Sequence, residues 1–291
     1  MAGELSAAAL PLEVARRGAR GNATAWLLIA PSCLSLVLLF VVPIAYVLLL
    51  SVTDPRFSLA HYQRIFTVPV YIRVLRNTFA TSLIVTALCL VIGYPIAYVM
   101  ARRGRWVSTV LLTVVAMSFW TGFLVRTYAW LVILGSKGPV AAAYGALGLG
   151  QAPQLLFSTF SSTLGMTHIL LPYMILALYA VMKKIDANHL KAAASLGARP
   201  VAAFREVFLP LSLAGVANGS LLVFVSCLGF FVTPVLLGTP RDMMISQLIN
   251  QQIEELLAWG FASAVAVVLL AATGLVIAVY NRFAGLDRLW G

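Results

Sequence analysis

The sequence predicts an all-α integral membrane protein with six transmembrane helices. The first indication is composition, because 62% of the 291 residues are hydrophobic and 10% are charged, whereas a soluble domain carries about 25% charged residues. The second is the length of the apolar segments, six of which reach the roughly 20 residues that a helix needs to cross a bilayer. These segments lack the alternation over about ten residues that is typical of the strands of a membrane barrel.

The first expected span covers residues 26–51 and follows a polar tail at residues 1–25. Its apolar run is longer than the roughly 7–15 residues of a cleavable signal core, so we expect it to be retained in the membrane. Residues 52–76 are expected to form an extracytoplasmic loop with a partly helical segment on the outer face. The other five spans are expected at residues 77–101, 107–134, 160–182, 209–237 and 260–281.

Lysine and arginine predict the orientation of these spans. With the N-terminus in the cytoplasm, 13 of the 20 basic residues fall in inside segments, 6 fall in outside loops, and Arg126 falls within a span. Because cytoplasmic loops are enriched in Lys and Arg, both termini are expected to be cytoplasmic. This topology, together with anionic lipid at the inner leaflet, accounts for the net charge of +11 without a nucleic-acid partner.

The sequence carries no motif for chemistry of its own. Cys33, Cys89 and Cys227 all fall in apolar segments, and they lack the spacing of a metal site or a disulfide framework. A phosphate-binding glycine loop with lysine, a nucleophile elbow and an HExxH helix are all missing. We therefore expect a chain that is not an enzyme and binds no metal or cofactor.

A polar stretch between the fourth and fifth spans, within residues 183–208, predicts a helix–turn–helix. Asp186 suits the cap of a helix that begins at Ala187, and Gly197 suits a left-handed stop. Pro200 then suits the first turn of a second short helix, and Leu209-Pro210 is expected to close the unit and open span five. An ordinary connecting loop would explain the polarity but not the stop and restart.

The same stretch resembles the cytoplasmic loop of importer-type ABC transporter permeases. That motif reads E-A-A, three residues, Gly, nine residues, Ile, one residue, Leu-Pro. The matching positions here are Lys191, Ala192, Ala193, Gly197, Val207, Leu209 and Pro210. Three further stretches, "SFWTGFLVRTYAWLVILGSKGPV", "LLPYMILALYAVMKKID" and "VFVSCLGFFVTPVLLG", resemble the polyamine (spermidine/putrescine) type within this superfamily.

The resemblance implies a type I ABC importer transmembrane fold, with its permease core at residues 77–282, in a bacterial inner membrane. It implies a second, related permease, two ATPase subunits that bind ATP and Mg²⁺, and an extracytoplasmic solute-binding protein. The stretch would be the coupling helix that contacts an ATPase subunit. The solute would be a polyamine or a related amine or organic acid. Lys191 replaces the usual Glu, so either the cognate ATPase is acidic at that point or this position faces solvent.

Arg126 is the first candidate for contact with the solute. It is the one ionised residue deep in an expected span, and burying an arginine there costs about 2.5–3.5 kcal/mol on insertion scales. Such a residue is expected to have a function or a partner. The alternative is that its side chain reaches the outer interface or bonds carbonyl groups at a helix break.

Aromatic residues and a proline form the second group of candidates for the translocation path. Aromatic faces can hold cations without carboxylates, although packing and an interfacial belt are the alternative. Pro234 predicts a local break, of the kind that membrane proteins tolerate where it lines a cavity. The candidates in this group are Trp120, Tyr128, Trp130, Phe230, Phe231, Thr233 and Pro234.

Two other classes of protein compete with the importer permease. A secondary transporter or channel that works alone is disfavoured by the loop spacing and by the lack of acidic residues in the expected spans. An intramembrane enzyme or structural anchor is disfavoured because the spans hold no nucleophile or metal constellation. Co-purification with an ATPase subunit would separate these classes.

Overall fold

A computed structural model describes residues 29–54, 56–150 and 152–284, and the expected tail at residues 1–25 lies outside them. The described residues are helical, without strands. Five helices are long and apolar enough to cross a membrane, or six if one bent pair is counted as a single span. The predicted fold class is therefore confirmed.

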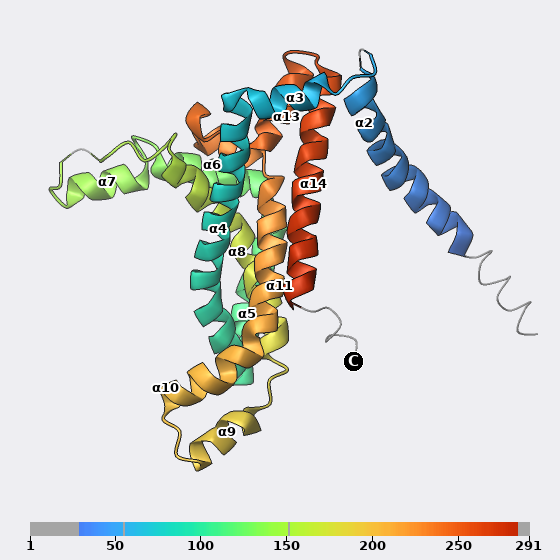
Figure 1. The fold of residues 1–291 in the computed structure, drawn as a ribbon. Helices are drawn as coiled ribbons and strands as arrows, with labels where there is room; N and C mark the ends of the chain where they lie inside the picture. The colour runs from blue at the N-terminus through green and yellow to red at the C-terminus, as the bar shows by residue number, and fades with distance from the viewer. Residues whose placement is uncertain (1–28, 55, 151, 285–291) are drawn as a thin grey trace, which may run out of the picture.

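Four long helices form an upright bundle (Figure 1). They are α4 (Pro69–Arg102), α8 (Thr159–Met182), α11 (Leu209–Leu228) and α14 (Trp259–Ala284). Glycines allow the helices to pack closely, as small residues do in membrane bundles. A Cβ at Gly219 would lie 2.8 Å from Met174 Sδ, and one at Gly215 would lie 3.0 Å from Val181 Cβ. Methionine and leucine side chains of α8 fill the space between α4 and α11.

The first span diverges from this bundle (Figure 1). It begins within the described residues at Ile29 and continues through η1 (Val37–Val41) into α2 (Val42–Thr53). None of the residues in the most apolar 18-residue stretch of this span is buried within the described chain. Lipid or another chain must therefore cover this span. Its C-terminal end is held in place because Asp54 Oδ2 accepts a hydrogen bond from the Gly260 amide at 2.9 Å.

A layer of short helices covers one end of the bundle (Figure 1). It consists of α3 (Ala60–Thr67), η3 (Pro240–Asp242) and α13 (Ile245–Glu254). The Arg64 guanidinium lies over the Phe261 ring, 4.8 Å from its centroid. The expected boundary of the second span differs, because α4 already begins at Pro69 and includes residues that were assigned to the outer loop.

The third expected span, residues 107–134, is not one helix. It is divided into α5 (Arg105–Trp120) and α6 (Phe123–Leu134), and α7 (Pro139–Ala146) follows. The chain bends by 94° between Arg105–Trp120 and Phe123–Ala146, the part that holds both α6 and α7. The cause is local, because Gly122 has an extended backbone (φ −54°, ψ 146°) that ends the helical hydrogen-bond pattern.

The fifth expected span, residues 209–237, is also divided. Helix α11 ends at Leu228, and α12 (Val232–Leu237) begins after a short break. The break precedes Pro234, which lies in the first turn of α12 rather than at the break itself. Proline has no N–H to offer the Phe230 carbonyl, and the Ser246 hydroxyl of α13 donates to that carbonyl instead.

The opposite end of the bundle carries a helical hairpin (Figure 1). It consists of α9 (Ala187–Ser195), α10 (Pro200–Ala203) and η2 (Phe204–Phe208). Leu209-Pro210 opens α11, as expected, but it makes no break, because the helical run continues from Pro200 to Leu228. A π-turn accommodates Pro210, with the Leu209 amide bonded to the Phe204 carbonyl.

Candidate functional site

The hairpin has a rigid turn at its tip. The Asp186 carboxylate accepts a hydrogen bond from the Asn188 amide at 2.9 Å and caps α9, as predicted. Gly197 has φ +87°, the left-handed conformation that glycine adopts at little cost. The Ala198 amide donates to the Ala193 carbonyl, and the Gly197 amide donates to the Ala194 carbonyl, both at 3.0 Å. These two bonds form a Schellman motif, so the stop is specified by the backbone.

The tip of the hairpin has no packing partner within the described chain. Leu196 is 89% exposed and Val201 is 76% exposed, and the hairpin helices mainly contact one another. Lys191 and Ala192 are also exposed, while Ala193 is half-buried. Exposed leucine and valine on a rigid turn, with small alanines beside them, form a surface that suits close contact with another protein.

Aromatic rings fix the base of the hairpin to the bundle. The Phe208 side chain is fully buried, and its ring centroid lies 4.9 Å from that of Tyr98 on α4. Phe204 lies edge-on to the same tyrosine at 5.4 Å. Val207 and Leu209 are half-buried beside them, whereas Pro210 is exposed. The residues of the sequence motif therefore divide into an exposed group at the tip and a group at the base.

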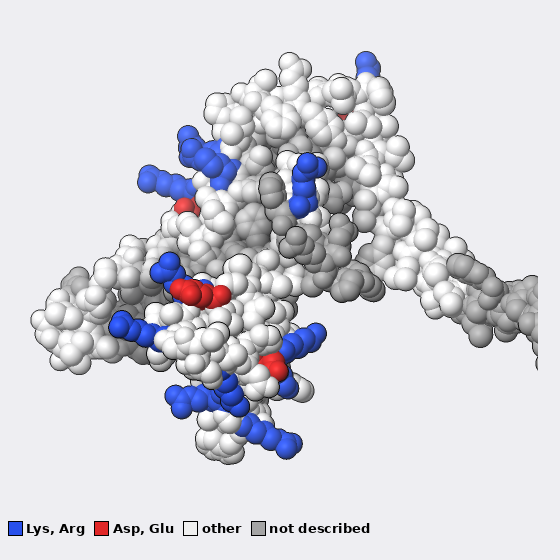
Figure 2. Space-filling view, turned by 60° about the horizontal axis from the view of Figure 1, so that its bottom comes forward, with Lys and Arg blue, Asp and Glu red and all other residues white. Residues whose placement is uncertain are grey.

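Basic side chains surround the hairpin. Figure 2 turns this end of the molecule toward the viewer and shows lysine and arginine around the tip, with few acidic side chains among them. The basic residues of this region are Arg102, Arg103, Arg105, Lys183, Lys184, Lys191, Arg199 and Arg205. This distribution is typical of the cytoplasmic side of a membrane protein.

A cavity of about 520 Å³ lies where the two helix breaks meet. Thr121 and Gly122 line it from the break between α5 and α6, and Gly229 lines it from the break after α11. Five aromatic residues line it, Phe119, Phe123, Tyr173, Phe230 and Phe231, beside the aliphatic Ile169, Leu170 and Val232. Broken helices are tolerated at membrane depth where they line such a space, so both interruptions are explained by one cavity.

Arg126 lies in the first turn of α6 and lines this cavity. Its Nη1 donates a hydrogen bond to Ser118 Oγ at 3.2 Å. Its Nε is buried and has no hydrogen-bond partner within the described chain. Arg126 is therefore held inside the space between the breaks, and the two phenylalanines of the sequence prediction, Phe230 and Phe231, line the same cavity.

The other predicted path residues do not line this cavity. Trp120 is 87% exposed and Tyr128 is 57% exposed. Trp130 Nε1 donates to His168 Nδ1 at 3.2 Å. Thr233 is buried, and its hydroxyl lies 3.1 Å from that of Thr127. Pro234 is buried beside it in α12.

Among the wall residues that sequence reasoning missed, three are aromatic, Phe119, Phe123 and Tyr173. The rings of Phe119 and Tyr173 meet edge to face, with centroids 5.1 Å apart. One signal was available, because Phe119 and Phe123 flank a Thr-Gly pair, and glycine is a local breaker of helices. Tyr173 gave no such signal, because it belongs to an uninterrupted helix.

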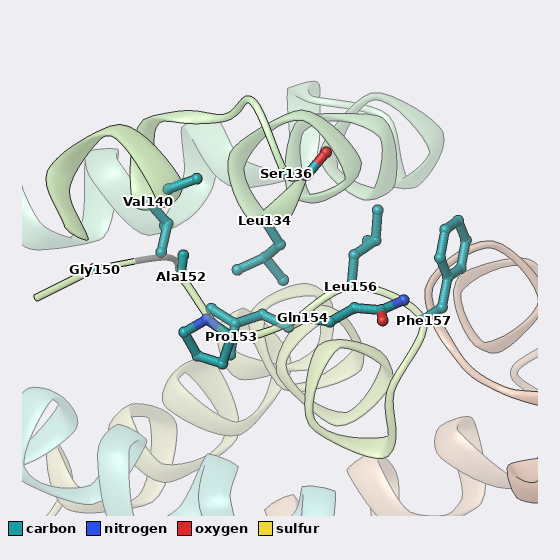
Figure 3. Close-up of a pocket in the computed structure, with 12 residues that line it drawn as sticks. Leu134, Ser136, Val140, Gly150, Ala152, Pro153, Gln154, Leu156 and Phe157 are labelled. Carbon is teal, nitrogen blue, oxygen red and sulfur yellow. The ribbon is translucent and has the colours of Figure 1, made fainter. Parts of the chain in front are cut away.

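A second cavity, of about 630 Å³, lies beside α6 and α7. Figure 3 shows residues 152–157 passing beneath the end of α6, with Gln154 and Ser136 among the residues around the space. Phe157 has a positive φ of 55°, which is uncommon for a residue with a side chain. This cavity contains none of the predicted path residues.

A broken-helix cavity at one end and a rigid, exposed hairpin at the other define a permease subunit of an importer. The chain belongs to the family described as "Binding-protein-dependent transport system inner membrane component", whose sequence profile matches residues 93–285. It is therefore a multi-pass inner-membrane permease component of an ABC importer.

Curated relatives agree with this assignment, and a solved structure shares the fold. The chain is 33% identical over 227 residues to the spermidine/putrescine transport system permease protein PotB of Escherichia coli (strain K12), covering 78% of this chain and 82% of that protein. It is 35% identical over 226 residues to PotB of Haemophilus influenzae, covering 77% and 79%. A chain of a bacterial alginate ABC transporter shares the fold, with a TM-score of 0.75 and 16% identity over 92% of this chain and 96% of that one.

Proposed function

We propose that this chain forms half of the translocation path of an ATP-driven importer for a small organic solute, a polyamine or a related amine or organic acid. A second, related permease forms the other half. An extracytoplasmic binding protein delivers the solute, and two partner subunits bind ATP and Mg²⁺ and hydrolyse the nucleotide. The family and the relatives named for spermidine and putrescine support this class of solute.

The observation that carries the proposal is the exposed, rigid tip of the hairpin. A coupling device needs a contact surface whose position is fixed relative to a span. Leu196 and Val201 supply the surface, and the Gly197 stop fixes its shape. A transporter that worked alone would leave these apolar side chains in water without a partner.

The continuous helix from Pro200 to Leu228 would carry movement of the tip into the membrane. Gly229 directly follows the far end of this helix, and it lines the cavity that also holds Arg126. Phe204 and Phe208 would carry the same movement to α4 through Tyr98. ATP-driven displacement of the hairpin would therefore change both walls of the path as rigid bodies, which is how alternating access arises.

We further propose that both termini are cytoplasmic. The basic residues around the hairpin support this orientation, and the described end of α14 lies at the same end of the bundle as the hairpin (Figure 1). Lys191 is exposed at the tip, so it would face either solvent or an acidic point on the ATPase subunit.

Purification of the tagged full-length chain from its native membrane tests the proposal. A related permease and an ATPase subunit should co-purify, and the cognate binding protein should stimulate ATP hydrolysis by the complex in proteoliposomes. A variant with Leu196→Asp and Val201→Asp should remain in the membrane and lose the ATPase subunit. Purification of the wild-type chain alone, in a form that still transports, would contradict the proposal.

A further inference from the structure

We infer that the cavity between the two helix breaks receives an anionic group of the solute, a carboxylate, and that Arg126 selects for it. The inference rests on the proposed function, because it names the chemistry of the solute that this permease carries. It favours the organic acids and amino-acid-like compounds within the proposed class over polyamines that have no anionic group.

The unsatisfied donors of Arg126 are the first support. A guanidinium has five N–H donors in a planar fork. Ser118 accepts from one of the terminal nitrogens, and Nε is buried without a partner in the described chain. Because Nε is buried, the donors that a solute can reach are the remaining N–H groups of the two terminal nitrogens. A carboxylate can accept two parallel hydrogen bonds from such a pair.

The lack of a counter-charge is the second support. None of the described residues that line the cavity is acidic. The acidic residues of the whole sequence are Glu4, Glu13, Asp54, Asp186, Glu206, Asp242, Glu254, Glu255 and Asp287. Those in the described chain lie at the ends of spans or outside them. Within the described part of this chain, no acidic side chain at the cavity neutralises Arg126, and its charge can therefore act on a group that enters the cavity.

The start of α6 adds to the positive potential. Gly122 precedes this 12-residue helix without a side-chain cap, and both Gly122 and Phe123 line the cavity. The free amide groups at a helix N-terminus carry partial positive charge. The amides of the first turn and the Arg126 side chain therefore act on the same space with the same sign.

The aromatic walls suit the remainder of such a solute. Phe119, Tyr173 and Phe231 offer ring faces and edges around the arginine. They would pack against an alkyl chain, and an aromatic face would also hold an ammonium group at a distance from Arg126. A diamine would place a second cation near the guanidinium, where repulsion is strong because the surroundings have a low dielectric constant.

The sign of the cavity can be measured without knowing the solute. In the assembled transporter, with Cys33, Cys89 and Cys227 replaced, a single cysteine at Thr121 would be treated with two methanethiosulfonates that carry a sulfonate or a trimethylammonium group. The measured quantity is the rate of reaction with the sulfonate reagent divided by the rate with the cationic reagent. We expect the sulfonate reagent to be favoured, and we expect Arg126→Gln to lower this ratio by about tenfold or more. Arg126→Lys keeps the charge and should keep the ratio.

A cysteine at Ser136, ten positions beyond Arg126, is the control for general reactivity. Its ratio of rates should not change with Arg126→Gln, because salt screens a charge that is more than about 10 Å away. An unchanged ratio at Thr121 in Arg126→Gln would overturn the inference, as would preference for the cationic reagent in the unsubstituted cavity.

The cognate binding protein gives an independent measurement. Calorimetry would compare putrescine with 4-aminobutyrate, in which one ammonium is replaced by a carboxylate, within a panel of amino acids, carboxylic acids and polyamines. A tightest ligand with a carboxylate supports the inference, and binding of di- and polyamines alone overturns it. The proposed function fails by a different result, namely a complex that shows no ATP hydrolysis dependent on the binding protein. The two failures can therefore be told apart.

Discussion

Replacement of Gly197 by alanine tests whether the stop at the tip of the hairpin couples ATP hydrolysis to transport. Gly197 has φ +87°, and a Cβ built there meets nothing within 4 Å. The substitution therefore causes no clash, and its whole effect is the cost of a left-handed backbone. That cost is about 1–2 kcal/mol for a residue with a side chain.

A cost of this size lowers the population of the native turn by about 5–30-fold relative to competing turns. The affinity of the ATPase subunit for the permease should fall by up to the same factor, reached where competing turns dominate in the variant, because only the native turn presents Leu196 and Val201 together. Asparagine tolerates the left-handed region better than alanine, so Gly197→Asn should lie between alanine and the wild type.

The assay is titration of purified ATPase subunit onto the permease pair in nanodiscs, followed by ATP hydrolysis stimulated by the binding protein. Gly148→Ala is the matched control, because Gly148 also has a positive φ, of 69°, with nothing within 4 Å, and it lies after α7, outside the hairpin. Gly148→Ala should bind the ATPase normally. Wild-type affinity and coupling in Gly197→Ala would refute the role of the stop.

Three further predictions concern orientation, packing and charge. In a background without the native cysteines, a cysteine at Ser136 should react with an impermeant thiol reagent from outside sealed cells, and one at Ser195 should not; the reverse would overturn the topology. Gly165→Val should lower the melting temperature of the purified complex, because a Cβ there would lie 2.6 Å from Leu237 Cδ1 and overpacking costs about 1–3 kcal/mol; an unchanged melting temperature would contradict the tight packing. Lys191→Glu restores the usual residue of the motif and should still bind the ATPase subunit, and loss of binding would show that the positive charge is required.

The long apolar helices and the hairpin could be predicted from the sequence, because their determinants are local. Apolar runs mark most spans whatever their neighbours are, and Asp186, Gly197 and Pro200 act within their own turns. The span near residues 160–182 agrees with α8 to within a residue.

The breaks could not be placed as well, because hydrophobicity continues through them. Residues around Gly122 are as apolar as those in a continuous span, and the bend depends on backbone conformation. Pro234 indicated a break in the fifth span but not its place, because Ser246 of another helix satisfies the carbonyl that the proline leaves free. The surroundings of Arg126 depend on α8 and α11, which no local pattern near Arg126 specifies.

Photocrosslinking from the tip of the hairpin tests the central claim most directly. A photoreactive amino acid would replace Leu196, which is 89% exposed, in the assembled transporter, and Leu147, which is 72% exposed beyond α7, would be the control position. We expect irradiation to link the Leu196 position to an ATPase subunit and the Leu147 position to none. An assembled, transporting complex that gives no ATPase product from Leu196, or equal amounts from both positions, would contradict the assignment of this hairpin as the coupling element.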